Sequence, residues 1–219
     1  MKAIIFDFDY TLGDSAKGIA LSVNYALGRL GYNESDFETI KKTIGLSLKE
    51  TYFALTSDND LSKAESFSDF FKQKADGVMV ENTVLYTGVK EVLQGLKSQG
   101  YKTAVVTTKF HYRIEQILNK FDAAELIDVI VGAEDVKIEK PNPEGLLWVI
   151  SHMGLNNNDV LYVGDSIVDA KTAENAVVNF AAVTTGTTLA EEFKKYKNKF
   201  VGENISDIYN YICTVDKNI

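Results

Sequence analysis

The chain has 219 residues, of which 45% are hydrophobic and 25% are charged, values that are ordinary for a globular protein. This length suffices for one large domain, or for one domain with a smaller domain inserted into it. The formal net charge of −8 argues against a nucleic-acid partner, because nucleic-acid binding depends on Lys and Arg side chains that neutralise phosphates.

Cysteine content and apolar runs exclude further classes of protein. Cys213 is the single cysteine, so neither a disulfide framework nor a cysteine-rich metal site is expected. The longest apolar runs, such as residues 146–150, are too short to span a bilayer, and the N-terminus lacks the pattern of a secretory signal. We therefore expect a cytoplasmic protein that does not associate with a membrane.

The chain opens with an apolar segment, AIIFDFDYT at positions 3–11, whose composition predicts a buried strand. Asp7 and Asp9 follow at its carboxyl end. In an extended chain, residues two apart share a face, so both carboxylates are expected to point into one small volume. Two such charges resist ionising together unless a cation lies between them or one retains a proton. A buried strand has no structural use for this pair, so we interpret it as part of a functional site.

The next part of the chain is predicted to be helical. Apolar residues recur at helical spacing in four segments, at residues 15–32, 36–44, 47–55 and 61–80. Strand patterns are lacking over the same stretch. Residues 15–83 are therefore expected to form a helical bundle inserted after the first strand.

From residue 84 onward, predicted strands and helices alternate. Strands are expected at residues 101–106, 128–131, 160–163 and 178–183, and helices at 88–98, 110–120, 143–153, 167–175 and 206–213. This alternation predicts a parallel sheet with helices on both faces. The expected fold class is therefore α/β, with a Rossmann-like core formed by residues 1–14 and 84–219 and a helical insertion at residues 15–83.

Polar side chains follow three of the predicted strands, namely Asp7 with Asp9, Thr107 with Thr108, and Asp165 with Asp169. Parallel sheets bind ligands beyond the carboxyl ends of their strands, so these side chains are expected to meet there. Three converging acids make a hard oxygen site that suits Mg²⁺ better than Zn²⁺. A simpler interpretation makes Asp165 or Ser166 the N-cap of the following helix.

Both prolines of the chain flank one asparagine, in the sequence Lys140-Pro141-Asn142-Pro143. Pro141 favours an extended conformation at Lys140, and Asn142 with Pro143 is typical of a helix start. The segment is either a rigid connection into a helix or a frame that holds Lys140 in place to neutralise a phosphate and the acids. Lys137 is a nearby alternative that lacks the proline frame.

In order and spacing, these motifs resemble those of the haloacid dehalogenase superfamily, in particular its phosphoglycolate phosphatase-like hydrolases. The four family motifs are matched by residues 7–11 (DFDYT), Thr107, Lys140 and residues 164–169 (GDSIVD). The resemblance covers nearly the whole chain and includes a helical cap domain inserted between the first two motifs.

The resemblance implies a mechanism and a cofactor. Asp7 would attack phosphorus to form an aspartyl-phosphate, and Asp9 would act as the general acid and base. Mg²⁺ would lie between the Asp7 carboxylate, the Asp9 main-chain carbonyl and the Asp165 carboxylate. Such an enzyme would act on a small phosphorylated metabolite and would be a monomer or a weak homo-oligomer.

The remaining motif residues would bind phosphate or support the site. Thr107, the adjoining Thr108 segment and Lys140 would hold the phosphoryl oxygens, and Thr11 would support the first motif. Asp169 would orient Lys140 or a metal-bound water. Phosphoryl transfer depends mainly on such positioning and charge neutralisation.

The sequence departs from the family pattern at Tyr10, where glycine is usual, and at Thr108, where asparagine is frequent. Sugar phosphomutases of the β-phosphoglucomutase type are the nearest alternative. They use a histidine and an arginine at positions that align with Ile19 and Leu48 here, and neither residue has that chemistry. The presence of Asp9 argues against a dehalogenase.

An alternative from another class is a non-catalytic phospho-acceptor or binding domain of the receiver type. Such a domain also gathers acids and a lysine at the edge of a parallel sheet. It would be shorter than this chain, however, and would lack the helical insertion.

Overall fold

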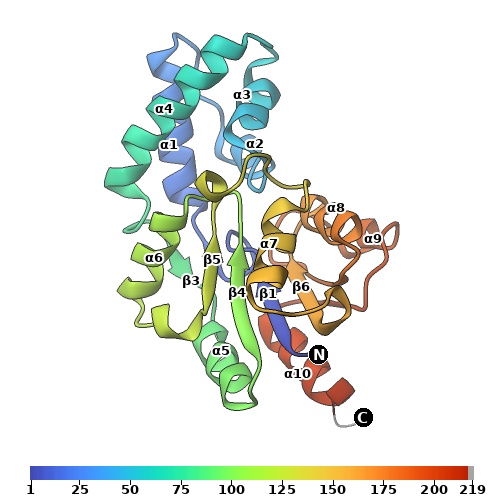
Figure 1. The fold of residues 1–219 in the computed structure, drawn as a ribbon. Helices are drawn as coiled ribbons and strands as arrows, with labels where there is room; N and C mark the ends of the chain where they lie inside the picture. Colours follow the sequence, from blue (N-terminus) through green and yellow to red (C-terminus); the bar gives the residue numbers. More distant parts are fainter. Residues whose placement is uncertain (217–219) are drawn as a thin grey trace. The chain divides into compact units, whose positions relative to one another are not determined.

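The computed structural model describes residues 1–216 of the chain (Figure 1). The chain divides into two compact units. The core unit comprises Met1–Gly13 together with the chain from Leu85 onward, and the helical unit comprises Asp14–Val84. The division expected from the sequence was residues 1–14 and 84–219 for the core and residues 15–83 for the insertion. That the helical unit acts as a cap stays a prediction.

The core unit contains a six-stranded sheet in the order β5-β4-β1-β6-β7-β8. Its strands are β1 (Ala3–Phe6), β4 (Lys102–Val106), β5 (Val129–Val131), β6 (Val160–Gly164), β7 (Asn179–Val183) and β8 (Phe200–Gly202). All neighbouring strands pair in parallel. When the strands are counted along the chain, this is the strand order of the Rossmann fold. The order, but not the direction of the strands, reverses between β1 and β6. Ligands bind beyond the carboxyl ends of the strands at such a reversal.

The sequence of β1 explains its central place in the sheet. All four of its residues are apolar and fully buried, as expected for a strand covered on both faces. Ile5 pairs with Ala104 of β4 on one side and with Tyr162 of β6 on the other. Because β1 ends at Phe6, the alternation expected to align Asp7 with Asp9 does not extend to them, and both lie in the following loop.

Helices cover the sheet. They are α5 (Val89–Ser98), α6 (His111–Lys120), α7 (Glu144–His152), α8 (Ile167–Ala176), α9 (Ala190–Phe193) and α10 (Ile205–Asp216), with short 3-10 turns at 124–126, 133–135 and 157–159. Residues of α7 and α8 share a buried apolar cluster with Ala3 and Ile5. Helix α5 packs against α10 and against β4, and α10 also contacts β7. The predicted parallel sheet with surrounding helices is confirmed.

The helical unit contains α1 (Ala16–Arg29), α2 (Phe37–Lys41), α3 (Leu48–Thr56) and α4 (Leu61–Val78). Helices α1 and α4 pack along each other, and Phe67 and Phe71 are buried in the cluster between the helices. Helix α3 begins at a capping box in which Ser47 and Glu50 bond each other's main chain. The short strands β2 (Gly13–Asp14) and β3 (Val84–Leu85) pair as a separate two-stranded sheet. Among the described residues, no helix combines the length and apolar character needed to cross a bilayer.

Candidate active site

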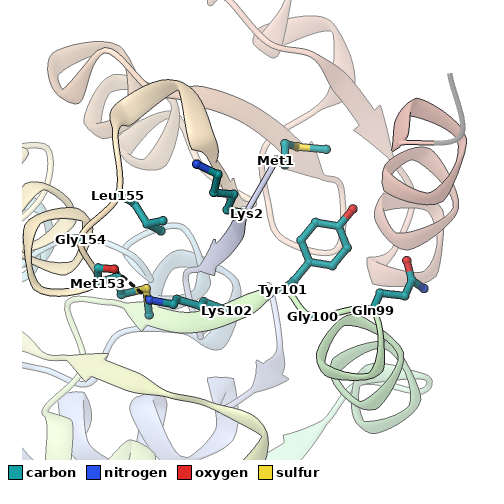
Figure 2. Close-up of a pocket in the computed structure, with 9 residues that line it drawn as sticks. All are labelled: Met1, Lys2, Gln99, Gly100, Tyr101, Lys102, Met153, Gly154 and Leu155. Carbon is teal, nitrogen blue, oxygen red and sulfur yellow. Dashed lines mark hydrogen bonds between the residues drawn. The ribbon is translucent and has the colours of Figure 1, made fainter. Parts of the chain in front are cut away.

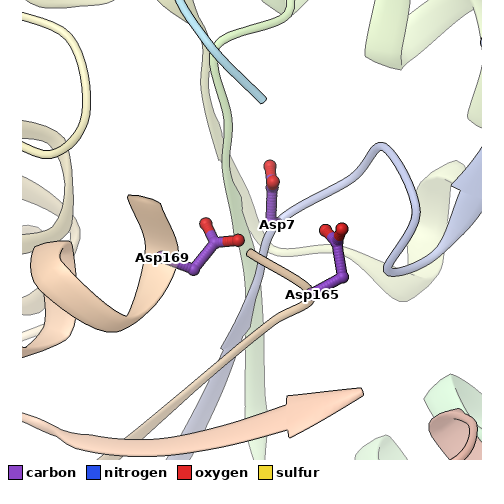
Figure 3. A group of neighbouring side chains, drawn as sticks. All are labelled: Asp7, Asp165 and Asp169. Atoms are coloured by element: carbon purple, nitrogen blue, oxygen red, sulfur yellow. The ribbon is translucent and has the colours of Figure 1, made fainter. Parts of the chain in front are cut away.

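The reversal point of the sheet brings together acids from two neighbouring strands. Asp7 directly follows β1, and its N–H extends the ladder by donating to the Val163 carbonyl at 2.8 Å. Asp165 directly follows β6, and Asp169 lies in the first turn of α8. One carboxylate oxygen from each of the three acids lies within 4.8 Å of the other two, and Figure 3 shows them converging. Asp7, Asp165 and Asp169 thus lie together at this edge of the sheet, whereas the set expected to hold a metal was Asp7, Asp9 and Asp165.

Lys140 lies between two of these acids. Its Nζ is 3.0 Å from Asp7 Oδ2 and 2.7 Å from Asp169 Oδ1, and it donates to the Tyr162 hydroxyl at 3.1 Å. Burial lowers the pKa of Lys140, but the Asp169 and Asp7 carboxylates outweigh this effect and raise the pKa above its ordinary value. Lys140 is buried whereas Lys137 is exposed, so the structure places the proline-framed lysine at the acids.

The N-cap of α8 is Ser166 and not Asp165. Ser166 is the N-cap, and its hydroxyl accepts from the Asp169 N–H at 3.2 Å. Asp169 Oδ2 in turn accepts from the Ser166 N–H and hydroxyl, at 3.1 and 2.6 Å. Because Ser166 serves as the cap, Asp165 remains available to the site. Gly164 leaves the room that Asp169 needs, since a Cβ there would lie only 2.5 Å from the Asp169 Cβ.

Asp9 pairs with Lys109, which belongs to none of the four motifs. Lys109 Nζ lies 3.0 Å from Asp9 Oδ2, and both side chains are buried. The Asp9 carboxylate therefore lies outside the group formed by Asp7, Asp165 and Asp169. This placement is compatible with the implied use of the Asp9 main-chain carbonyl, rather than its carboxylate, as a metal ligand. The one sequence signal for Lys109 was its position directly after the threonine pair at a strand end.

The site carries an excess of negative charge. Its ionisable groups are four carboxylates and two ammonium groups, namely Asp7, Asp9, Asp165, Asp169, Lys109 and Lys140. Full ionisation leaves two negative charges without a counter-ion. Burial raises the pKa of Asp7 to about 6, despite the opposing effect of Lys140. Burial, together with Asp169 and Asp7, raises the pKa of Asp165 well above its ordinary value.

These groups fit a hard divalent cation. Asp7 Oδ1 is buried and has no hydrogen-bond partner among residues 1–216. A divalent cation would supply that partner and would balance the two excess charges. Carboxylate and carbonyl oxygens are also the ligands that Mg²⁺ prefers. Asp169 is less suited as a ligand, because Lys140, Tyr162 and Ser166 already occupy its oxygens.

We expect Mg²⁺ to stabilise the protein more at about pH 7.5 than at about pH 5. The pKa of Asp7 is 3.8 in the unfolded chain and is raised to about 6 in the folded protein. Between pH 3.8 and about pH 6, the folded protein therefore holds a proton that the unfolded chain has lost. The metal-free fold therefore loses stability as the pH rises through this window, and a bound cation restores it. Melting temperatures in MgCl₂ and in EDTA at both pH values measure the effect. An equal Mg²⁺ shift at the two values would contradict the expectation.

The threonines of the motifs differ in how they join the site. The Thr11 hydroxyl lies 3.3 Å from Asp165 Oδ1. Thr107 is buried at the end of β4, and its hydroxyl accepts from the Lys109 N–H at 3.3 Å. Thr108 is half-buried, and no hydrogen bond within the described chain ties its side chain to the acids. The structure thus links Thr11 and Thr107 to the site but does not link Thr108.

Tyr10, the departure noted in the first motif, has a left-handed backbone with φ of 58°. Its N–H donates to the Gly13 carbonyl at 2.8 Å, and its own carbonyl accepts from the Thr185 hydroxyl. Glycine adopts such a φ without steric cost, whereas a residue with a Cβ does not. The chain therefore follows a path suited to glycine while carrying a bulky side chain.

Tyr10→Gly is expected to destabilise the protein by about 1–4 kcal/mol. Relief of the left-handed strain gains about 1–2 kcal/mol, whereas loss of the ring, which is only 4% exposed, costs about 3–5 kcal/mol. The control is Val177→Gly, because Val177 has φ of 56° but a side chain that is 76% exposed. The control should gain about 1 kcal/mol. Denaturant unfolding measures both, and stabilisation by Tyr10→Gly would contradict the assignment.

A shallow hollow of about 630 Å³ lies at the opposite end of the sheet (Figure 2). Lys2 and Lys102 line it, at the amino ends of β1 and β4. Lys102 Nζ donates to the Met153 carbonyl at 2.8 Å, and Lys2 Nζ lies 3.2 Å from Asp159. None of the predicted site residues lines this hollow, so the acid cluster remains the candidate active site.

The chain combines an α/β core with acids and lysines gathered where the strand order reverses. Comparison with known families shows which class of protein this is. Residues 4–183 match the haloacid dehalogenase-like hydrolase family, and the chain belongs to this family.

Named relatives and solved structures agree with this membership. The chain is 34% identical to a phosphoglycolate phosphatase of Cereibacter sphaeroides, over 85% of this chain and 86% of that protein. It is 30% identical to the pyrophosphatase PpaX of Bacillus cereus, over 99% of each. A haloacid dehalogenase-like hydrolase of Bacteroides fragilis, known from a crystal structure, has a TM-score of 0.92 and 39% identity, covering 94% of this chain and 99% of that one.

The predicted family, the α/β fold class and the phosphatase class of enzyme are confirmed by these comparisons. The family match spans both units, which argues against the alternative of a receiver-type phospho-acceptor domain. The roles of individual site residues stay predictions.

Proposed function

We propose that the protein is a Mg²⁺-dependent phosphomonoester hydrolase that works through an aspartyl-phosphate and acts on a small phosphorylated metabolite. The observation that carries this proposal is the position of Asp7. It lies at the reversal point of the sheet beside Lys140 and Asp165, with one buried carboxylate oxygen that lacks a hydrogen-bond partner among the described residues. One relative is named for phosphoglycolate and the other for pyrophosphate, which supports a phosphate substrate without selecting one.

In the first half of the proposed reaction, Asp7 attacks phosphorus and the bond from phosphorus to the leaving oxygen breaks. Asp9 donates its proton to that oxygen, and Lys109, 3.0 Å from Asp9 Oδ2, orients the carboxylate. Lys140 holds Asp7 through the 3.0 Å contact to Oδ2. The Thr107 hydroxyl and Lys140 bind the phosphoryl oxygens, whose charge the transition state spreads among them.

In the second half, water attacks the aspartyl-phosphate and Asp9 takes the proton of that water. This step releases inorganic phosphate and regenerates the Asp7 carboxylate. Asp7, the Asp9 main-chain carbonyl and Asp165 would hold Mg²⁺, which neutralises phosphate charge when bound. Asp169 holds Lys140 in place through the 2.7 Å ion pair, which supports the first of its two implied roles.

Phosphate release from a substrate panel, with and without Mg²⁺, tests the proposal. The panel comprises phosphoglycolate, sugar phosphates, nucleotides and pyrophosphate. Mg²⁺-dependent hydrolysis of at least one small phosphomonoester is expected. Undiminished hydrolysis in excess chelator, or no hydrolysis of any monoester, would overturn the proposal.

The phosphomutase alternative is disfavoured by the helical unit. Ile19 and Leu48 align with the histidine and arginine of the mutases. Ile19 belongs to the buried apolar core of this unit, and the half-buried Leu48 packs against that core. These positions therefore serve packing in this chain. Conversion of glucose 1-phosphate to glucose 6-phosphate without net phosphate release would favour the mutase instead.

A further inference from the structure

We propose that the loop of residues 184–188, which follows β7, holds two parts of the active site in position. In this proposal Thr185 holds the turn that carries Asp9, and the Gly186 main chain holds the Asp165 carboxylate. Both are positioning residues, because neither is expected to touch the reacting atoms. The inference rests on the proposed function, since it assigns these residues to the support of that same site.

The first contact fixes the turn after Asp9. The Thr185 hydroxyl donates to the Tyr10 carbonyl, across 175 positions of sequence. This carbonyl belongs to the peptide between Tyr10, which follows Asp9, and Thr11, whose hydroxyl contacts Asp165. Because Tyr10 has an unfavourable left-handed φ, the turn requires restraint from its surroundings. Thr185 supplies this restraint at Tyr10, which lies between Asp9 and Thr11, the residue that contacts Asp165.

The second contact restricts Asp165. A Cβ at Gly186 would lie 2.8 Å from Asp165 Cγ and 3.2 Å from Asp165 Cβ, and closer still to Oδ2. The main chain of the loop thus packs directly against one side of the carboxylate. On the other side, the Thr11 hydroxyl lies 3.3 Å from Oδ1. Asp165 is therefore held between the β1 loop and the β7 loop before any ligand binds.

The two contacts come from consecutive residues, so one loop couples both parts of the site. Strand β7 pairs with β6, and Gly164 at the end of β6 is in register with Ala182 of β7. The loop after β7 therefore emerges beside Asp165. Groups that orient metal ligands in this way commonly affect metal affinity or activity about 10–100-fold when they are changed.

Gly186→Ala tests the contact with Asp165. The added Cβ forces either the carboxylate or the loop to move, so the affinity for Mg²⁺ should fall by about 10–100-fold. Calorimetric titration of the substrate-free protein with MgCl₂ measures this affinity without turnover. Gly28→Ala is the matched control, because a Cβ at Gly28 meets no atom within 4 Å. Unchanged Mg²⁺ affinity in folded Gly186→Ala would overturn the proposal.

Thr185→Val tests the contact with Tyr10 and applies even where Gly186→Ala fails to fold. Loss of the hydroxyl should lower kcat about tenfold with KM nearly unchanged, and Thr185→Ser should restore kcat. Thr187→Val is the control, because Thr187 is exposed in the same loop. Wild-type kcat in Thr185→Val, or no recovery in Thr185→Ser, would overturn the role of Thr185.

The two readouts separate this inference from the proposed function. Wild-type protein that binds Mg²⁺ but hydrolyses no phosphomonoester would refute the proposed function, while the comparison of Gly186→Ala with Gly28→Ala would still decide the role of the loop. An active wild-type enzyme whose Gly186→Ala variant binds Mg²⁺ equally well would refute the loop alone.

Discussion

Asp7→Asn is expected to abolish phosphate release, with kcat reduced by at least about 10⁴-fold. The amide is neutral and is a poor nucleophile, so the aspartyl-phosphate does not form. The variant should remain folded, because burial already disfavours the charged form of Asp7, whose pKa is raised to about 6, and because Lys140 keeps its ion pair with Asp169. Phosphate release and the melting temperature in EDTA measure the two effects.

Asp159→Asn is a suitable control for this experiment. Asp159 forms a surface ion pair with Lys2, and such pairs contribute little to stability. This variant should retain wild-type turnover. Substantial activity in Asp7→Asn would rule out Asp7 as the nucleophile and with it the proposed mechanism.

Lys140→Met is expected to lower both stability and turnover. It leaves Asp7 and Asp169 buried without their shared counter-ion, which should cost about 3–5 kcal/mol at neutral pH. The cost should shrink as the pH falls, because Asp7, whose pKa burial raises to about 6, then gains a proton. Turnover should fall by at least about 100-fold, since the lysine also neutralises the transferring phosphoryl group. Denaturant unfolding in EDTA and phosphate release measure these effects.

Lys137→Met is the matched control, because Lys137 lies three positions away but is exposed. Its stability should stay within about 0.5 kcal/mol of the wild type, with turnover unchanged. A larger loss in Lys137→Met than in Lys140→Met would reverse the assignment of the two lysines.

The parts of the fold that were predicted correctly have strong local patterns. The apolar runs of β1 and β6 indicated buried strands, and their abrupt ends at Asp7 and Asp165 indicated the edge that bears the site. By contrast, β8 and α9 were not predicted. They contain three and four residues, which is too short for the period of a strand or helix to show in the sequence.

The parts of the site that were missed depend on tertiary contacts. Lys109 resembles an ordinary surface lysine in the sequence, and only the position of its strand end beside the β1 loop buries it against Asp9. The contact from Thr185 to Tyr10 joins residues 175 positions apart, and no local pattern records it. Tyr10 was noted as unusual for its family, but a tyrosine does not by itself indicate a left-handed backbone.

The insertion of the helical unit after β1 has a consequence for how the enzyme reaches its native state. Strand β1 is synthesised well before its two partner strands, whose paired residues begin at Lys102 and Val160. The centre of the sheet therefore depends on closing two long loops, and contacts so distant in sequence form slowly. The helical unit is contiguous in sequence and needs no such closure. During synthesis, the site cannot form until the chain has been made as far as Asp165, because only then can β6 pair with β1 and bring Asp165 beside Asp7.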